Sequence, residues 1–446
     1  MQYRWIMSLI DDAVAVASRR CWVPGDLGPV TSLGDEVAAG AAAEQIWANV
    51  ESLYRSGMHP GIQLCVRHHG DVVVNRAIGF ARGNLPGRWV DRDSATPMTV
   101  DTPVNLFSAA KAVSAMVMHK LEELGAFALD DPVAEHLPGF ERHGKGDITI
   151  RHLLTHRAGI AAWPGEAFDL DLLADPDRIV DVIRDLRPSA GPGGASAYHA
   201  VSGGFVMEAV TRAATGRSMR DVLAKEIKEP LGLDWLDFGV APEDAASVAH
   251  NVETGFFPGP VIDLFIKRVL GKPWGRILRM SNDPRFLTSV IPSGNVIVTA
   301  SDIAAFYQCL LDGGVLDGTR VFEDDTISRA VSSDRGGLEL DRMLAIPIRY
   351  SSGFMLGSET VSLYGWNHPR AFGHLGMSNL FTWADPDRAL VVALLTTGKP
   401  VLGPHLPALV QLITGIHEIF PELEGTTTTP STPSRPAERT LEGAPS

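Results

Sequence analysis

A serine and a lysine three residues apart, Ser108 and Lys111, are the pair in this chain best suited to chemistry. If a helix begins at Ser108, Lys111 lies one turn further along the same face. A serine hydroxyl is a weak nucleophile until a base removes its proton. A lysine can be that base when burial lowers its pKa, because desolvation disfavours the ammonium form. The pair therefore predicts acyl transfer at a helix N-terminus, where backbone N–H groups can stabilise an oxyanion.

The spacing alone does not establish this chemistry. Of the eight lysines in the chain, only Lys111 has a serine three residues before it. A Ser-x-x-Lys match is nevertheless expected by chance roughly half the time in a chain of this composition. The alternative interpretation is an N-capping serine followed by an unrelated helix lysine.

Two segments further along the chain support the catalytic interpretation. Tyr198 lies in a glycine-rich loop just before a helical pattern, where a hydroxyl near a cation would gain phenolate character and share proton transfer with Lys111. Residues 372–377 open a strand, in which Gly376 would let a substrate backbone approach closely. His374 is expected to orient the substrate or assist proton transfer, and its alternative is a space-filling role at the strand start.

Several common site signatures are absent from the sequence. It contains no G-x-S-x-G, P-loop, G-x-G-x-x-G or H-E-x-x-H motif. Cys21, Cys65 and Cys309 are odd in number and widely spaced, which favours isolated buried thiols over disulfides or a metal site. No cofactor and no metal are expected.

Composition narrows the class of protein. The chain has 446 residues, of which 45% are hydrophobic and 21% charged, as in ordinary globular proteins. A net charge of -14 disfavours nucleic acid as a partner, because phosphate backbones are repelled. No apolar run reaches the ~20 residues that span a bilayer. A cytoplasmic location is the default expectation, with peripheral contact to a membrane or cell envelope as the alternative.

Turn residues and hydrophobic periodicity predict the helices and strands that position the candidate residues. β-rich runs flank residues 68–71 and again residues 385–388, and each arrangement predicts an antiparallel hairpin. Residues 126–240 are mostly helical segments, and a strand-rich pattern returns from residue 291. Strands, a long helical middle and strands again predict an α+β architecture, with an antiparallel sheet flanked by helices and a helical lobe inserted between its two halves.

The expected domain organisation has three parts. Residues 1–45 form an N-terminal extension that contains an apolar helical pattern from Trp5 to Val14. Residues 46–421 form one hydrolase domain, with a helical lobe at roughly 126–290. Residues 422–446 form a disordered tail rich in Thr, Pro and Ser. Within the lobe, the apolar segment 241–290 is expected either to pack on the body or to act as a lid or wall against an apolar substrate.

The order Ser108-x-x-Lys111, then Tyr198, then His374-x-Gly376 resembles the serine β-lactamase and penicillin-binding-protein superfamily. The flanking segments ITIRHLLTHRAGI and PSGNVIVTASDIAAFYQCLLDGG agree, and the resemblance covers roughly residues 55–400. Within the superfamily the sequence is most similar to the class C-like (family VIII) esterases and actinobacterial lipases. The resemblance implies a β-lactamase/transpeptidase-like fold.

Two departures from the family pattern favour esters as substrates. The third motif is usually K-T-G, whose cation binds a substrate carboxylate, but here it reads His374-Leu375-Gly376. The second motif is usually Y-x-N, whose amide binds a peptide-like side chain, but here it reads Tyr198-His199-Ala200. Esters with apolar acyl chains need neither group. Alternatives are a β-lactamase or D-amino peptidase, a transacylase, and a non-catalytic binding relative.

The resemblance also implies the roles of the site residues. Ser108 would attack an ester carbonyl, with Lys111 and Tyr198 acting together as base and proton relay. The backbone N–H groups of Ser108 and Met377 would hold the oxyanion. The implied partner is a small-molecule ester or lipid. If segment 241–290 contacts the substrate, trimming it should reduce activity on long chains more than on short ones.

Overall fold

The computed structural model describes residues 20–23, 30–32, 40–164, 169–256, 259–333 and 335–423. The expected helical pattern near Trp5 and all of the chain beyond residue 423 lie outside these ranges. No helix in the described ranges is long and apolar enough to cross a membrane.

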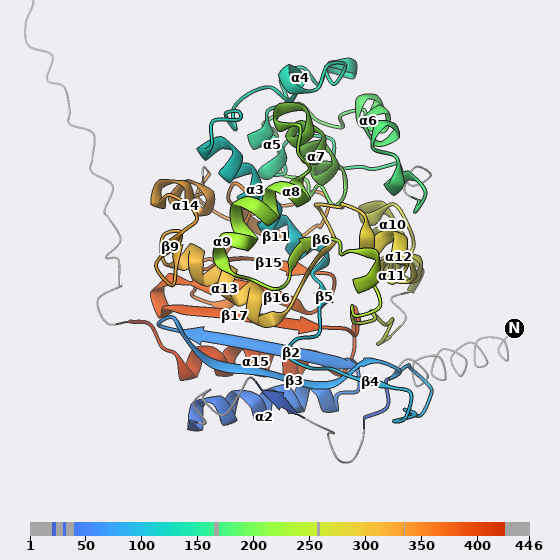
Figure 1. Cartoon of the computed structure of the whole chain (residues 1–446), viewed down its shortest axis with the longest axis vertical. Helices are drawn as coiled ribbons and strands as arrows, with labels where there is room; N and C mark the ends of the chain where they lie inside the picture. Colours follow the sequence, from blue (N-terminus) through green and yellow to red (C-terminus); the bar gives the residue numbers. More distant parts are fainter. Residues whose placement is uncertain are drawn as a thin grey trace, which may run out of the picture.

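Within the described residues, ten strands form one antiparallel sheet that joins the beginning and the end of the chain (Figure 1). Across the sheet the order is β1 (Thr31–Ser32), β3 (Asp71–Arg82), β2 (Gly61–His68), β17 (Leu390–Thr396), β16 (Leu380–Asp385), β15 (Phe372–Gly376), β12 (Met355–Leu356), β11 (Pro347–Tyr350) and β10 (Glu339–Leu340). The tenth strand, β4 (Thr96–Pro97), pairs with β3 at the edge. β2 pairs with β17, so the two halves of the sheet meet at its centre.

Both predicted hairpins are present. β2 and β3 pair around a turn in which His69 and Gly70 have φ of 52° and 86°, a left-handed conformation that glycine adopts without strain. β16 and β17 pair around a short 3-10 turn at Pro386–Arg388. Local turn chemistry therefore predicted the pairing of neighbouring strands correctly.

Helices cover both faces of the sheet (Figure 1). α2 (Ala41–Arg55) and α15 (Leu406–Ile419) pack on one face, and the expected boundary at residue 45 lies inside α2. α3 (Ala110–Glu123) and α13 (Ala300–Leu311) belong to the larger hydrophobic core on the other face.

The helical lobe lies between the two halves of the sheet in sequence. Its helices are α4 (Val133–His136), α5 (Ile150–Leu154), α6 (Pro176–Asp185), α7 (Ser202–Thr215), α8 (Met219–Leu223), α9 (Glu229–Leu231), α10 (Gly259–Leu270), α11 (Trp274–Ser281) and α12 (Pro284–Thr288). A small sheet of β5 (Val104–Asn105), β7 (Val296–Val298) and β6 (Leu236–Phe238) connects the lobe to the body. The chain after β7 also contains two small hairpins and one more helix. These are β8 (Val315–Leu316) with β9 (Thr319–Arg320), α14 (Asp324–Val331), and β13 (Val361–Ser362) with β14 (Gly365–Trp366). This is the predicted α+β architecture with an inserted helical lobe.

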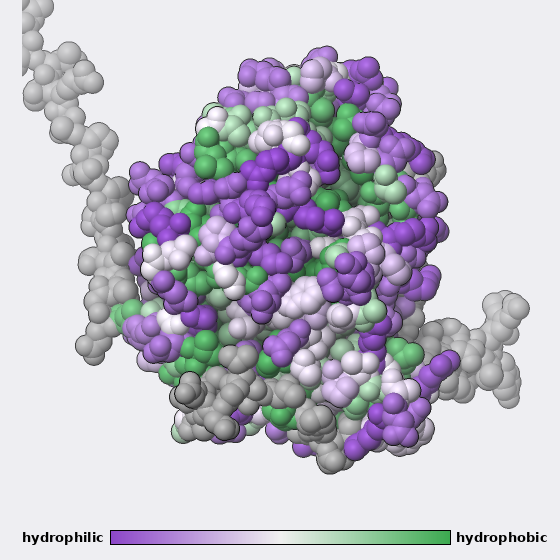
Figure 2. All heavy atoms as spheres, viewed as in Figure 1, coloured by the Kyte–Doolittle hydropathy of each residue, from purple (hydrophilic) through white to green (hydrophobic). Residues whose placement is uncertain are grey.

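The three cysteines are buried, as predicted. Cys21, Cys65 and Cys309 are buried free thiols, as expected from their spacing. Hydrophilic residues predominate over the helical half of the face in Figure 2, and hydrophobic residues lie between them.

Candidate active site

Ser108 is presented by a strained turn between β5 and α3. Phe107, directly before it, has φ of 50°, a left-handed conformation that a bulky side chain adopts at a cost. The Asn105 side chain holds this turn, because its Oδ1 accepts the Phe107 N–H at 3.2 Å. Ser108 lies in a 3-10 turn, Phe107–Ala109, and α3 follows at Ala110. The serine is half-buried, so its hydroxyl is held at the start of a helix next to open space.

Lys111 is buried on the first turn of α3, as its spacing from Ser108 predicted. Its Nζ donates hydrogen bonds to the backbone carbonyls of Ala200 at 2.9 Å and Ser293 at 3.0 Å. Burial lowers the pKa of Lys111 from its ordinary value to about 7. A large fraction of this lysine is therefore neutral near pH 7, which is what a general base requires.

Tyr198 lies against the lysine. The Lys111 Nζ is 4.7 Å from the centre of the buried Tyr198 ring. Burial raises the pKa of Tyr198, and the neighbouring Ser108 side chain offsets part of this rise. The phenol therefore stays protonated at neutral pH. This differs from the phenolate character expected from a nearby cation, because desolvation of the phenolate outweighs the attraction.

Two buried histidines, His156 and His199, contact Tyr198 or form hydrogen bonds with its loop. The His156 ring centre is 4.7 Å from that of Tyr198, and His156 Nδ1 accepts the His199 backbone N–H at 3.2 Å. His199 Nε2 in turn accepts the Ile160 N–H at 3.2 Å. Burial lowers the pKa of both histidines, that of His199 to about 3, so both rings are neutral. They shape the loop through hydrogen bonds and packing.

Asp341 is a site residue that the sequence analysis missed. Its fully buried Oδ1 accepts the backbone N–H groups of Tyr198 at 3.2 Å and of Met343 and Leu344 at 2.8 Å each. Its Oδ2 accepts the Tyr350 hydroxyl at 3.2 Å. No local motif marks Asp341, because its partners on the Tyr198 loop are 143 or more residues away in sequence.

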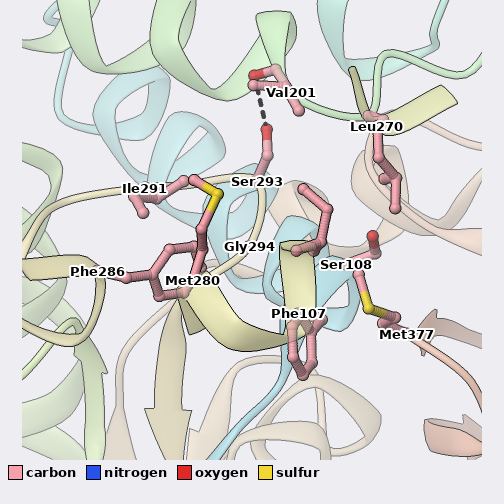
Figure 3. Close-up of a pocket in the computed structure, with 12 residues that line it drawn as sticks. Phe107, Ser108, Val201, Leu270, Met280, Phe286, Ile291, Ser293, Gly294 and Met377 are labelled. Atoms are coloured by element: carbon pink, nitrogen blue, oxygen red, sulfur yellow. Dashed lines mark hydrogen bonds between the residues drawn. The ribbon is translucent and has the colours of Figure 1, made fainter. Parts of the chain in front are cut away.

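Ser293 was also missed as an individual residue. Its carbonyl holds the Lys111 amine, while its hydroxyl donates to the Val201 carbonyl at 3.1 Å and accepts the Gly204 N–H at 3.0 Å. Figure 3 shows the Ser293 hydroxyl directed at Val201. The run Pro292–Asn295 has the composition of a turn, so a loop could have been predicted there. Its contact with the start of α7 could not, because the two segments are far apart in sequence.

The third predicted motif lies on β15, next to the turn that carries Ser108. The carbonyl oxygen of Leu106 would be 2.5 Å from a Cβ added to Gly376, so this glycine lets β15 approach the serine turn closely. His374 is buried, its Nδ1 is 2.8 Å from the Leu375 carbonyl, and burial lowers its pKa to about 3. Met377 follows β15 directly and lies beside Ser108 (Figure 3).

Two cavities meet at Ser108. The first, with about 500 Å³ of empty space that is partly open to solvent, is lined by Phe107, Ser108, Ala200, Val201, Leu270, Ile277, Met280, Phe286, Ile291, Ser293, Gly294 and Met377 (Figure 3). The second, with about 640 Å³ of empty space that is also partly open to solvent, is lined by Ser108, Tyr198, Phe265, Ile266, Val269, Leu270, Trp274, Leu344, Met355, Leu375, Gly376, Met377 and Ser378. Neither set of lining residues includes a charged side chain or a histidine, and His374 belongs to neither.

Helices α10, α11 and α12 form much of the wall of these cavities. Ile266, Leu270 and Trp274 face the second cavity, and Met280 and Phe286 face the first. The segment 241–290 thus contributes directly to the space around Ser108. Among the described residues, no group of three or more His, Cys, Asp or Glu side chains is placed to hold a metal ion.

Comparison with known proteins identifies the family. The family described as Beta-lactamase matches residues 48–413. The esterase/beta-lactamase LipL of Mycobacterium tuberculosis is 30% identical over 322 residues, which cover 69% of this chain and 72% of that protein. The fold and the match together show that the chain belongs to the β-lactamase family of serine hydrolases.

Solved structures agree with this assignment. The chain is similar to a penicillin-binding protein homologue from Caulobacter crescentus, with a TM-score of 0.73 and 26% identity over 88% of this chain and 100% of that one. A family VIII carboxylesterase has the same fold, with a TM-score of 0.73 and 23% identity over 87% of this chain and 100% of that one. The protein is therefore a hydrolase of this family, as its motifs predicted.

Proposed function

We propose that this protein hydrolyses carboxylic esters with apolar acyl groups through an acyl-enzyme on Ser108. The observation that supports this most is the uncharged lining of both cavities at Ser108. A β-lactam or peptide substrate carries a carboxylate, which requires a cation where it binds. An ester requires only apolar contacts and the groups that perform acyl transfer. The relative LipL is named as an esterase/beta-lactamase, so ester hydrolysis is one of the two activities in its name.

Lys111 acts as the base in this proposal. A neutral amine has two N–H groups and one lone pair, and the two N–H groups donate to the carbonyls of Ala200 and Ser293. The lone pair is then free to accept the Ser108 proton as Oγ attacks the ester carbonyl carbon. The oxyanion that forms is stabilised by the backbone N–H groups of Ser108 and Met377.

Tyr198 completes the proton transfer. Collapse of the tetrahedral intermediate breaks the bond between the carbonyl carbon and the alcohol oxygen, and the alcohol leaves with a proton supplied through the Tyr198 phenol. The Lys111 ammonium then replaces that proton. Water attacks the acyl-enzyme in the same way, giving the acid and restoring the Ser108 hydroxyl. His374, which lines neither cavity, positions the neighbouring Tyr198 ring, whose centre is 6.2 Å away.

The test is hydrolysis of p-nitrophenyl esters of increasing acyl length beside the β-lactam nitrocefin, with wild type and Ser108→Ala. We expect ester turnover in the wild type and a loss of about 10³-fold or more in the variant. Mass spectrometry should detect an acyl adduct on the peptide that contains Ser108. Ester turnover that survives in Ser108→Ala would overturn the proposal. Nitrocefin turnover as efficient as ester turnover would favour a β-lactamase.

A further inference from the structure

Four exposed apolar residues lie on α10, which lines the second cavity, and on two nearby loops. We call Phe256, Leu264, Phe265 and Leu402 the mouth patch. Leu264 and Phe265, on α10, are 68% and 37% exposed, and Phe256 and Leu402 are 43% and 45% exposed. The Phe256 N–H donates to the Leu402 carbonyl at 3.1 Å, so these two residues lie side by side. Single exposed apolar residues are common on soluble proteins, whereas exposed apolar residues gathered in one region mark a binding surface.

The mouth patch is continuous with the site. Phe265 is partly exposed and also lines the second cavity with Ser108. The next residue, Ile266, packs in a buried cluster with Phe107 and Trp274, and Val401 lies against the same cluster. Because Val401 adjoins Leu402, the patch is linked to the serine turn from two sides. A molecule that touches the patch is therefore close to the entrance of the cavity.

Basic side chains accompany the patch. Between Asp263, on α10, and Asp283 the chain contains five Lys or Arg residues and no acidic residue, although its net charge is -14. Lys267, Arg268 and Arg276 are exposed. None of these three forms an ion pair within the described part of the chain. On α10, Lys267 and Arg268 lie three and four residues after Leu264, which places them on its face.

We propose that the outer face of α10 binds an anionic phospholipid surface and presents the mouth of the active site to it. Leu264 and Phe265 would enter the boundary between headgroups and acyl chains, as apolar residues of interfacial helices do. Lys267 and Arg268 would extend to the phosphates, with their alkyl stems along the apolar region. The remaining acidic surface is repelled by the same phosphates, which selects one orientation. This inference extends the proposed function by specifying how an apolar ester reaches Ser108.

Vesicle co-sedimentation with the full chain tests the docking. The vesicles are phosphatidylcholine alone or phosphatidylcholine with phosphatidylglycerol. We expect the wild type to sediment with the anionic vesicles, and added salt to release it. Leu264→Ser should weaken this binding by about tenfold, because one inserted leucine side chain is lost. Lys267→Gln with Arg268→Gln should weaken it by about tenfold or more and should abolish the preference for phosphatidylglycerol.

Matched controls separate docking from other effects. Leu124→Ser and Lys225→Gln alter an exposed leucine and an exposed lysine elsewhere, and both variants should bind as the wild type does. Ser108→Ala should also bind normally, so a failure of the proposed chemistry and a failure of docking give different results. Turnover of a short soluble ester should be unchanged in Leu264→Ser, because Leu264 lines neither cavity.

Two results would overturn the proposal. One is a wild type that stays in the supernatant with every vesicle. The other is a patch that mediates self-association instead: sedimentation velocity would then show a dimer that Leu264→Ser dissociates, with no vesicle binding by either protein.

Discussion

In the proposed mechanism Lys111 accepts the Ser108 proton, and the surroundings of its amine set the pH range in which it can do so. Among the described residues its amine is hydrogen-bonded to two carbonyls and to no carboxylate. Burial is the cause of its low pKa, about 7. In the unfolded chain the lysine has its ordinary pKa near 10.5, so between these two values the unfolded state binds more protons. The contribution of this group to folding stability therefore rises with pH across that window.

The same pKa predicts the pH dependence of activity. Turnover should rise as pH increases through about 7 and then level off, because only the neutral amine accepts the Ser108 proton. Lys111→Arg stays charged at every accessible pH and should lose about 10² to 10⁴-fold in kcat/KM. The measurement is kcat/KM for a short p-nitrophenyl ester against pH, with Lys225→Arg as the control. A profile that stays flat on both sides of neutrality would contradict this role for Lys111.

Asp341 is predicted to position Tyr198 without touching the substrate. Asp341→Ala leaves two buried N–H groups and one partly buried N–H group without an acceptor and should destabilise the fold by about 3 kcal/mol. Asp341→Asn keeps one carbonyl oxygen for these groups and should cost about 1 kcal/mol. Urea unfolding measures both losses, and kcat should fall with little change in KM. Equal losses of stability in the two variants would argue against the hydrogen-bond account.

At the scale of elements, the α10–α12 wall defines the space available to substrate. We assign the acyl chain to the first cavity, because Phe107, directly before Ser108, lines that cavity and not the second. The second cavity then accepts the alcohol. Both cavities are apolar, so acyl length and not charge should determine selectivity.

A large residue in the wall should shorten the accepted acyl chain. Met280→Trp adds volume to the first cavity and should lower kcat/KM on long-chain esters by about tenfold relative to short ones. Val269→Trp adds volume to the second cavity instead and should leave the chain-length profile unchanged. A series of p-nitrophenyl esters measures both variants. If Val269→Trp alone shortens the accepted chain, the assignment of the two cavities is reversed.

At the scale of the whole molecule, the central pairing of β2 with β17 makes the fold depend on both ends of the chain. α15 comes last among the described helices, yet it covers the same sheet face as α2. Their shared cluster includes Val50, Leu64, Trp383 and Leu412, all nearly inaccessible to solvent. Beyond the helix, Glu422 adds an ion pair of 3.0 Å with the buried Arg388 side chain.

Truncation tests this dependence. A chain ending at residue 404 lacks α15 and should fail to fold, because one face of the sheet is exposed to water. A chain ending at residue 423 keeps every described contact and should have the melting temperature of the full chain. Circular dichroism during heating measures both. A cooperative transition near the full-length temperature in the shorter chain would contradict the prediction.

The sequence by itself determined the features that depend on near neighbours. The spacing of Ser108 and Lys111 placed both at the start of one helix, because helical geometry is local. The turn at His69 and Gly70 defined a hairpin for the same reason. The order of the three motifs identified the family, and with it the fold and the approach of Tyr198 to the lysine.

The tertiary structure decided what surrounds those residues. The Ser293 carbonyl reaches Lys111 across 182 residues of sequence, and Asp341 reaches Tyr198 across 143. The expected closeness of Tyr198 to the Lys111 cation suggested phenolate character, whereas the burial of Tyr198 in the folded protein keeps its phenol protonated. The two apolar cavities likewise arise where α10–α12 meets the serine turn. Solvent exclusion and long-range packing are properties of the assembled chain, so no local pattern of residues could have specified them.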